Sequence, residues 1–344
     1  MITQHERLGS FFFNIEIMGS GQCNLRCPSC AVGNSPTVRN PMGMMKVDLL
    51  DRVMAKAAAE CDVTGVGLFN WAEPLLHPKL PELVRTVHRY GARVHLSSNL
   101  NYAPKLDELM RENPAEFRIS ASGFSQSVYG VTHRDGDIEL VKGNMIALGA
   151  AKAAAGATTS IHVLYHRYKG NLDDERLMKA FCRELGFDFI PVWAYMTPLE
   201  KVLAYADDDA SLADVTAADL EIIERLVPPP REALALAAKY KDQPCILLDE
   251  QITMDFRGDV TLCCAVYDAG KYAIANFLDT PMRTLQAMKS SAALCTRCTA
   301  RGAHVYVTYK AGREMDALAE RHLVEYYAGA LKEHPPLTAG TISI

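Results

Sequence analysis

Short apolar runs alternate with amphipathic stretches over the first two hundred residues of the chain. Runs with the length and composition of strands fall at 11–18, 64–70, 92–98, 116–122, 158–165 and 187–193. Between them, apolar positions recur at helical spacing near 47–60, 79–90, 104–112, 138–155 and 172–185. Strands that alternate with helices in this way predict an α/β fold built on a parallel sheet with right-handed crossovers.

The pattern changes after residue 200. Residues 201–243 are rich in Ala and Asp and are broken by Pro228–Pro230, so we interpret them as a helical linker. Residues 244–310 show few long periodic runs, and a last amphipathic helix is predicted near 311–332. The expected organisation is an α/β unit at 1–200, a linker at 201–243, a small unit at 244–310, and a C-terminal helix and tail at 311–344.

Composition excludes several classes of function. With 49% hydrophobic and 22% charged residues, the chain has ordinary globular composition. A net charge of -5 argues against a large phosphate-binding surface, so we expect no nucleic-acid partner. No apolar run approaches the roughly 18 residues of a membrane span, and Phe11–Phe13 lacks the flanks of a signal peptide. We therefore expect no membrane partner.

The chain holds ten cysteines, and their placement is uneven. Without a secretory signal, such a count indicates metal or redox chemistry in a reducing compartment, so we expect a cytoplasmic protein. Five cysteines fall in the last hundred residues. Cys182 is in helical register with Met178 and Leu185, which favours core packing for this thiol.

The densest group is Cys23, Cys27 and Cys30, spaced C-x3-C-x2-C directly after the first apolar run. Three thiolates are too few to close a structural zinc site, which takes four ligands. They suit a [4Fe–4S] cluster held by three cysteines, with one iron open to a small molecule. A zinc site or a chance grouping of thiols is the alternative.

A second motif follows the second predicted strand, Asn70-Trp71-Ala72-Glu73-Pro74. Together with the cysteine triplet it resembles the radical S-adenosylmethionine (SAM) superfamily, and Glu73 matches the Glu of the family's GGEP motif. Trp71 and Ala72 replace the two glycines. The resemblance implies an open, partial (β/α)6 barrel, SAM as cofactor, and a contact from Glu73 to the SAM amino group. An ordinary loop turn is the alternative for Glu73-Pro74.

Further SAM contacts are implied by the same resemblance. Family members often have an aromatic residue before the third cysteine, where this chain has Ser29, so we expect the adenine to rest on other groups, such as the backbone of 192–195. Ser120 and Ser122 share one face of the fourth strand, and Asn99 ends the third. Each is a candidate for the ribose or carboxylate of SAM, with plain strand-end hydrogen bonding as an equal alternative.

The C-terminal cysteines resemble those of the auxiliary-cluster domains called SPASM and Twitch. Cys245 is followed by twelve residues, Gly258 and Cys263, and later by Cys295 and Cys298 as C-x2-C. Where a full SPASM domain continues with cysteines, this chain has His304 and Thr308. The resemblance therefore implies the Twitch pattern, with a second [4Fe–4S] cluster on the four cysteines just named. Zinc fits four thiolates equally well, and Cys264 is an alternative ligand to Cys263.

The whole arrangement is similar to that of the 2-deoxy-scyllo-inosamine dehydrogenases, which implies oxidation of a small, sugar-like or cyclitol-like molecule. We expect a 5′-deoxyadenosyl radical to remove a carbinol hydrogen, His162 or His166 to act as base, and the auxiliary cluster to accept an electron. For each histidine, a purely structural hydrogen bond is the alternative. A flavodoxin or ferredoxin is the expected reductant.

Three other functions stay open. A radical epimerase would need a hydrogen-donating thiol, and Cys264 is the candidate because Cys61 and Cys182 lie at a helix end and within a helix. A peptide maturase often has an N-terminal recognition domain, and the cluster motif here starts at residue 23. A non-catalytic iron–sulfur electron carrier would leave the open-iron triplet and Glu73 without a role.

Overall fold

The computed structural model of the protein describes residues 7–308 and 310–333. Within these residues the strands form one nine-stranded sheet in the order β6-β5-β4-β3-β2-β1-β7-β8-β9. Its first six strands in sequence match the predicted runs: β1 (Ser10–Ile15), β2 (Asp62–Gly67), β3 (Val94–Ser98), β4 (Glu116–Ala121), β5 (Ser160–Arg167) and β6 (Asp188–Trp193). All neighbouring pairs among these six are parallel, which confirms the predicted α/β fold.

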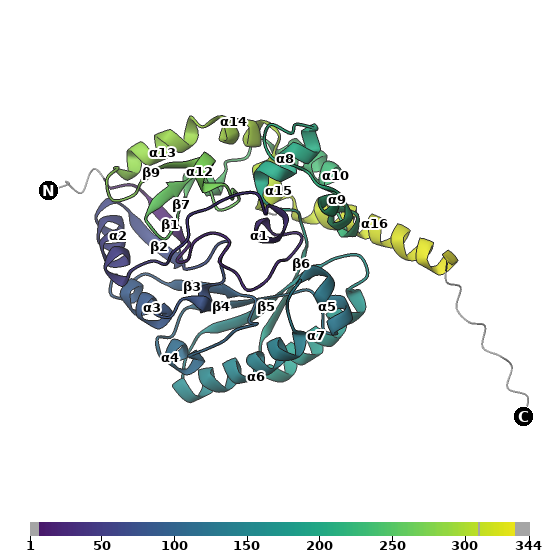
Figure 1. The fold of residues 1–344 in the computed structure, drawn as a ribbon, viewed down its shortest axis with the longest axis horizontal. Coiled ribbons are helices and arrows are strands. Elements are labelled where there is room, and N and C mark those ends of the chain that lie inside the picture. Colours follow the sequence, from purple (N-terminus) through teal and green to yellow (C-terminus); the bar gives the residue numbers. More distant parts are fainter. Residues whose placement is uncertain (1–6, 309, 334–344) are drawn as a thin grey trace, which may run out of the picture.

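Five predicted helices connect these strands and cover the outer face of the sheet (Figure 1). They are α2 (Val47–Glu60), α3 (Leu80–His88), α4 (Leu106–Arg111), α6 (Ile138–Ala155) and α7 (Leu172–Leu185). Asp137 caps α6 by accepting hydrogen bonds from the backbone N–H groups of Glu139 and Leu140. Gly156 and Gly186 end α6 and α7 in the left-handed conformation that glycine tolerates best. The helix α5 (Gln126–Thr132) has no counterpart in the sequence prediction.

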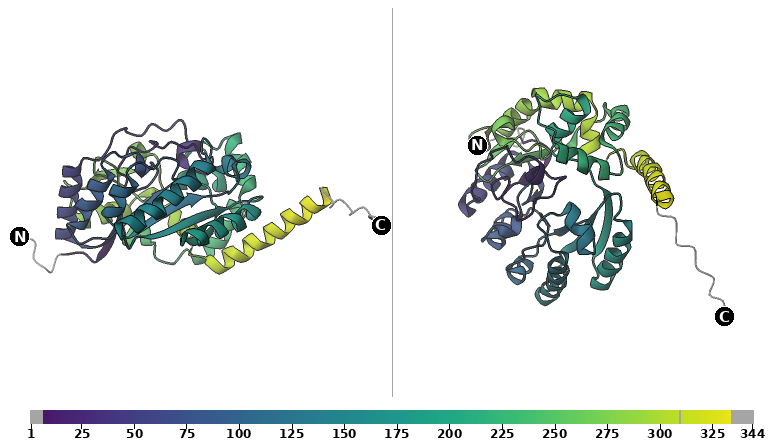
Figure 2. Two further views of the ribbon diagram at one scale, coloured as in Figure 1. Left: turned by 90° about the horizontal axis from the view of Figure 1, so that it is seen from below. Right: turned by 45° about the vertical axis from the view of Figure 1, so that its right-hand side comes forward.

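The six parallel strands do not close into a barrel, as the resemblance to the radical SAM superfamily implies. The far edge of β1 pairs with β7 (Gln251–Met254) instead of β6. From β7 the sheet continues antiparallel through β8 (Asp259–Thr261) and β9 (Ala273–Asn276). Residues 251–276 thus extend the sheet of the partial barrel, and the curved sheet leaves one side open (Figure 2).

Some of the remaining helices gather at the open side of the sheet, whereas others lie along β9 or in the loops of the partial barrel (Figure 1). The longer ones are α8 (Leu199–Asp207), α9 (Ala217–Arg225), α10 (Pro230–Ala237), α13 (Met282–Ser290), α14 (Ala293–Ala300) and α16 (Gly312–Glu333). The short ones are α1 (Ala31–Asn34), η2 (Pro74–Leu76), η3 (Ala238–Tyr240), α11 (Ile246–Asp249), α12 (Ala269–Tyr272) and α15 (Ala303–Val307). The predicted tail after α16 lies outside the described residues. Over residues 7–308 and 310–333, no helix has both the length and the apolar character that crossing a membrane requires.

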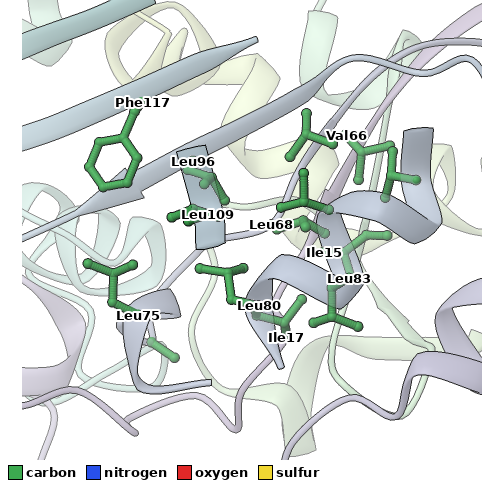
Figure 3. Packing of buried hydrophobic residues seen from close by; sticks show 14 of the residues in the cluster. Ile15, Ile17, Val66, Leu68, Leu75, Leu80, Leu83, Leu96, Leu109 and Phe117 are labelled. Carbon is green, nitrogen blue, oxygen red and sulfur yellow. The ribbon is translucent and has the colours of Figure 1, made fainter. Parts of the chain in front are cut away.

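Two hydrophobic cores hold the molecule together. The first lies between the sheet and the outer helices, and Ile15, Leu68 and Leu83 pack there (Figure 3). It includes Cys182, as the helical register predicts, and it extends to Phe277 beyond β9. The second core joins the end of β6 to the helices of the open side. The C-terminal segment is therefore packed onto the barrel through both cores.

Candidate functional site

A cavity opens at the carboxyl ends of the parallel strands, where barrels of this kind place their active sites. The loop that leaves β1 lines one wall with the thiols of Cys23, Cys27 and Cys30. Glu73 lines the same cavity from the loop after β2. The two sequence motifs, fifty residues apart along the chain, are therefore brought to one site.

The cysteine loop is held by short-range hydrogen bonds. The N–H of Cys30 donates to the carbonyl of Cys27 (3.0 Å), and Cys30 then precedes α1. The Sγ of Cys23 accepts from the backbone N–H of Leu25 (3.4 Å) and the side-chain amide of Asn99 (3.6 Å). Burial raises the pKa of Cys23 to about 12 and that of Cys30 to about 11. These thiols must lose their protons to the surroundings before they can bind a metal as thiolates.

Glu73 is buried and oriented by the end of β3. Its carboxylate accepts from Ser98 Oγ (2.7 Å), from the N–H of Asn99 (2.9 Å) and from the N–H of Leu75 (3.1 Å). Burial raises its pKa from 4.5 to about 7. A buried carboxylate of this kind favours a cationic partner, because an ammonium offsets the cost of charging it.

Glu16 is a second buried carboxyl that sequence reasoning missed. It accepts from the backbone N–H groups of Trp71 (3.1 Å) and Ala72 (2.9 Å), and from the hydroxyl of Ser20. Burial raises its pKa to about 7. Glu16 therefore fixes the backbone at the two positions where the GGEP motif has glycines. An acidic residue within the apolar run 11–18 is the signal that could have identified it.

Tyr168 lies beside Ser29, where the family often has an aromatic residue. The two hydroxyl groups are 2.8 Å apart, and Tyr168 follows β5, lines the cavity and is 4% exposed. The carbonyl of Ser29 also accepts from the N–H (3.1 Å) and the hydroxyl (2.9 Å) of Thr197. Within the predicted 192–195 segment, Ala194 and Tyr195 line the cavity. An aromatic ring thus reaches the third cysteine from a distant strand.

Of the three polar residues predicted on or after β3 and β4, two line the cavity and the third supports a residue that lines it. Asn99 and Ser120 line the cavity. Ser122 is fully buried behind it, and its Oγ is 2.6 Å from Nδ1 of His133. His133 lines the cavity, and burial lowers its pKa to about 3, so its imidazole is neutral at pH 7. Ser122 therefore positions a histidine that lines the cavity.

Of the two predicted bases, only His166 lines the cavity. Its Nδ1 is 3.3 Å from the carbonyl oxygen of Ala121. Because a carbonyl oxygen only accepts, Nδ1 carries the proton and Nε2 has a free lone pair. Burial lowers the pKa of His166 to about 4, which keeps the ring neutral.

His162 does not line the cavity, although it shares a strand face with His166. Its Nε2 is 3.0 Å from Oε1 of Glu116, and the other carboxylate oxygen is 2.6 Å from Nδ1 of His95. Hydrogen bonds from the two rings lower the pKa of Glu116 well below its usual range. The expectation that His162 points into the cavity is corrected by this pairing across β3, β4 and β5.

A second cavity brings together the C-terminal cysteines. Cys245, Cys263, Cys295 and Cys298 all line it. Cys264 lines neither this cavity nor the first one, and its buried thiol lies against the side chain of Gln251. The structure therefore does not place Cys264 where a hydrogen donor to a substrate in the barrel would be.

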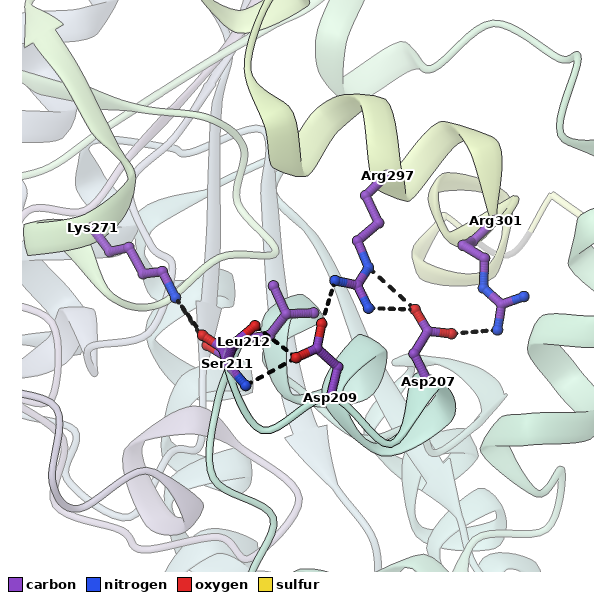
Figure 4. A network of polar contacts seen from close by, with 7 residues as sticks. All are labelled: Asp207, Asp209, Ser211, Leu212, Lys271, Arg297 and Arg301. Atoms are coloured by element: carbon purple, nitrogen blue, oxygen red, sulfur yellow. Dashed lines mark hydrogen bonds and ion pairs between the residues drawn. The ribbon is translucent and has the colours of Figure 1, made fainter.

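Arginines of α14 anchor two of these cysteines to the rest of the molecule (Figure 4). Arg297, which lies between Cys295 and Cys298, donates to Asp207 (2.7 Å) and Asp209 (2.7 Å) at the end of α8. Arg301, one turn later, pairs with Asp207 as well. These contacts fix the helix from which Cys295 and Cys298 reach the second cavity.

His304 also lines the second cavity and is 1% exposed. Its Nε2 is 2.9 Å from the carbonyl of Gln243, so Nε2 carries the proton. Its Nδ1 has no hydrogen-bond partner among the described residues.

The spacing of the thiols bears on which metal group fits. In the parts of the chain that the structure describes, no three His, Cys, Asp or Glu side chains are close enough to hold one metal ion. A single zinc ion draws its thiolates to about 2.3 Å from one centre. A four-iron cluster binds each thiolate through a different iron, so its ligands stand farther apart. Three cysteines line the first cavity and four line the second, and cysteine thiolates are the ligands that iron–sulfur clusters take.

Comparisons with known proteins agree with the site. Residues 17–172 match the model of the radical SAM superfamily, and this range includes the cysteine triplet and Glu73. The PqqA peptide cyclase of Streptomyces rochei is 26% identical over 278 residues, which are 76% of this chain and 71% of that protein. The GTP 3′,8-cyclase of Chlorobaculum tepidum is 32% identical over 84 residues, 23% of each chain. Residues 17–172, which hold the cysteine triplet and Glu73, are thus similar to the radical SAM superfamily.

Solved structures share the fold. Streptococcus suis SuiB bound to S-adenosylmethionine superposes with a TM-score of 0.54 at 12% identity, covering 84% of this chain and 68% of that one. The structure of anSMEcpe with bound AdoMet gives a TM-score of 0.55 at 13% identity, covering 94% of this chain and 98% of that one. At this identity the likeness concerns the fold.

Proposed function

We propose that this protein cleaves SAM reductively and uses the resulting radical to oxidise a substrate held in the barrel cavity. The observation that carries the proposal is the convergence of Cys23, Cys27, Cys30 and Glu73 on one cavity at the carboxyl ends of the strands. Three thiols and a buried carboxyl are the donor set that a three-cysteine cluster and its SAM ligand require.

Each of these residues has a defined task in the proposal. Cys23, Cys27 and Cys30 hold a [4Fe–4S] cluster, which when bound supplies the electron that splits SAM to a 5′-deoxyadenosyl radical. Glu73 accepts hydrogen bonds from the SAM amino group, and its own partners on β3 hold the carboxylate in place. The ring of Tyr168 packs against the adenine of SAM. It takes the role of the aromatic residue that the family often has at the position of Ser29.

His166 is the proposed base. Among the described residues, no hydrogen bond engages its Nε2, and the ring is neutral at pH 7. A neutral imidazole accepts a substrate hydroxyl proton as the neighbouring carbon is oxidised. This step suits a carbinol, so a small sugar-like or cyclitol-like molecule is the proposed substrate, as the sequence resemblance implies.

The second cysteine group is proposed to hold an auxiliary [4Fe–4S] cluster through Cys245, Cys263, Cys295 and Cys298. One observation supports it: the four cysteines, which lie far apart along the chain, line one cavity. Such a cluster accepts the electron that oxidation of the substrate radical releases. A flavodoxin or ferredoxin is the proposed source of the electron for SAM.

Peptide modification is a second candidate, favoured by one observation. The relative that aligns over 76% of this chain is named as a peptide cyclase. An epimerase has less support, because Cys264 lies away from the cavity.

Isotope tracing tests these alternatives. The reconstituted protein is supplied with SAM, dithionite and a candidate substrate deuterated at its carbinol carbons. Deuterium in 5′-deoxyadenosine together with a ketone product supports the proposal. Replacement of the substrate deuterium by solvent hydrogen in an otherwise unoxidised product indicates epimerisation, and a crosslinked peptide product indicates cyclisation. Either result refutes the proposed oxidation.

A further inference from the structure

Lys289 is fully buried and has no carboxylate partner. It lies on α13, and its exposed fraction is 0%. Its ammonium donates to three backbone carbonyls, those of Leu247 (2.9 Å), Leu248 (3.1 Å) and Gln251 (2.6 Å). Among the described residues, no carboxylate lies within ion-pair distance of it. A buried ammonium without a counter-ion is costly, and it usually marks a missing negative charge.

The ionisable groups around Lys289 are thiols, which become negative only when they bind a metal group. The acidic side chains that act electrostatically on its ammonium are Cys245, Cys263, Cys264 and Cys295, three of which line the second cavity. Two of its carbonyl acceptors belong to Leu247 and Leu248, whose side chains line the same cavity. Lys289 thus contacts the wall of the cavity from behind while the cysteines face into it.

We propose that Lys289 is the internal counter-ion of the group that the four cysteines bind, and that it sets the reduction potential of that group. Four thiolates carry more negative charge than a cluster core neutralises, so the loaded site is an anion. One-electron reduction adds a further negative charge. A fixed cation behind the cavity stabilises the reduced form more than the oxidised form and therefore raises the potential. The inference rests on the auxiliary cluster of the proposed function.

A structural role is the competing explanation, because three hydrogen bonds to the residues that follow Cys245 also brace this segment. Two substitutions separate the roles. Lys289→Gln removes the charge but keeps amide donors for the carbonyls, whereas Lys289→Met removes both. Lys271→Met is the matched control, since Lys271 is an exposed lysine that donates to two carbonyls, of Ser211 and Leu212 (Figure 4).

The experiment is a potentiometric titration followed by electron paramagnetic resonance. The full chain is reconstituted with iron and sulfide in a Cys27→Ala background, so that the auxiliary group dominates the signal. We expect Lys289→Gln and Lys289→Met each to lower the equilibrium constant for one-electron reduction at least tenfold. Tenfold corresponds to about 59 mV toward more negative potential. Lys271→Met should leave the potential unchanged.

Each outcome decides the matter. A lower potential in both Lys289 variants, with the auxiliary iron retained, supports the inference. Loss of the auxiliary iron from Lys289→Gln but not from the control indicates the structural role and overturns the inference. An unchanged potential in Lys289→Gln overturns it, whether or not Lys289→Met retains iron. If the chain with Lys289 intact binds no metal group at these cysteines, the auxiliary cluster of the proposed function is refuted and the inference falls with it. If the cluster is intact but its reduction potential does not depend on Lys289, only this inference is refuted and the proposed auxiliary cluster stands.

Discussion

Glu73→Gln gives a quantitative test of how the cavity binds SAM. In the metal-free protein, burial raises the pKa of Glu73 from 4.5 to about 7. The carboxyl is therefore about one-tenth ionised at pH 6 and about nine-tenths ionised at pH 8. Only the ionised form pairs fully with the SAM amino group. Removing one partner from a buried ion pair costs about 3 kcal/mol or more, which is on the order of a hundredfold in Kd.

The assay is equilibrium binding of SAM to the anaerobically reconstituted protein at pH 6, 7 and 8. We expect Glu73→Gln to weaken binding on the order of a hundredfold at pH 8. The ratio of the variant's Kd to the wild-type Kd should fall about tenfold between pH 8 and pH 6, because protonation removes the charge from Glu73 itself. Taking the ratio at each pH cancels the titration of SAM.

Glu139→Gln is the control, since Glu139 is an exposed acid in the first turn of α6. Its Kd for SAM should equal that of the wild type at every pH. The assignment of Glu73 to the SAM amino group is refuted if the Kd of Glu73→Gln for SAM lies within threefold of the wild-type Kd. It is also refuted if the ratio of the two Kd values is the same at pH 6 and pH 8.

Further predictions concern other parts of the two sites. Burial raises the pKa of Glu16 from 4.5 to about 7, so the folded state holds a proton that the unfolded state releases, and stability falls as pH rises through that window. The free energy of unfolding, measured by urea denaturation, should fall by about 3 kcal/mol more in the wild type than in Glu16→Gln between pH 4.5 and pH 8. The same pH dependence of this free energy in both proteins would contradict the prediction. Tyr168→Leu should weaken SAM binding about tenfold, roughly the cost of a lost stacking contact, and unchanged binding would remove Tyr168 from the adenine site. Cys298→Ala should lower the bound iron by one cluster and leave SAM binding intact, whereas full iron retention would contradict the auxiliary ligand set. His166→Gln should slow product formation about a hundredfold without changing SAM affinity, and normal turnover would exclude His166 as the base.

The long, strongly periodic elements could be predicted from the sequence, but the short ones could not. The predicted helices 138–155 and 172–185 coincide with α6 and α7. The strands β7, β8 and β9 have only three or four residues each, too few for a period of two to be visible. The pairing of β7 with β1 is a long-range contact that no local pattern encodes. This is why the continuity of the sheet into the C-terminal segment was not foreseen.

The sequence could predict the site residues that belong to a motif. It could not predict the residues whose role depends on how close they lie to the carboxyl end of a strand. His162 and His166 share a face of β5, but four residues of strand separate them by about 13 Å. Because the cavity lies at the carboxyl end, only His166 reaches it. Likewise, Glu16 and Tyr168 belong to no motif, and only the folded chain brings them to the residues around Glu73 and Ser29.

Release of 5′-deoxyadenosine tests the central claim most directly. The purified protein is reconstituted anaerobically with iron and sulfide, then supplied with SAM and dithionite, and the product is quantified by chromatography and mass spectrometry. The account predicts that the wild-type protein releases 5′-deoxyadenosine and methionine in equal amounts, and that Cys27→Ala releases neither. Iron-loaded wild-type protein that leaves SAM intact, or a Cys27→Ala variant as active as the wild type, would contradict it.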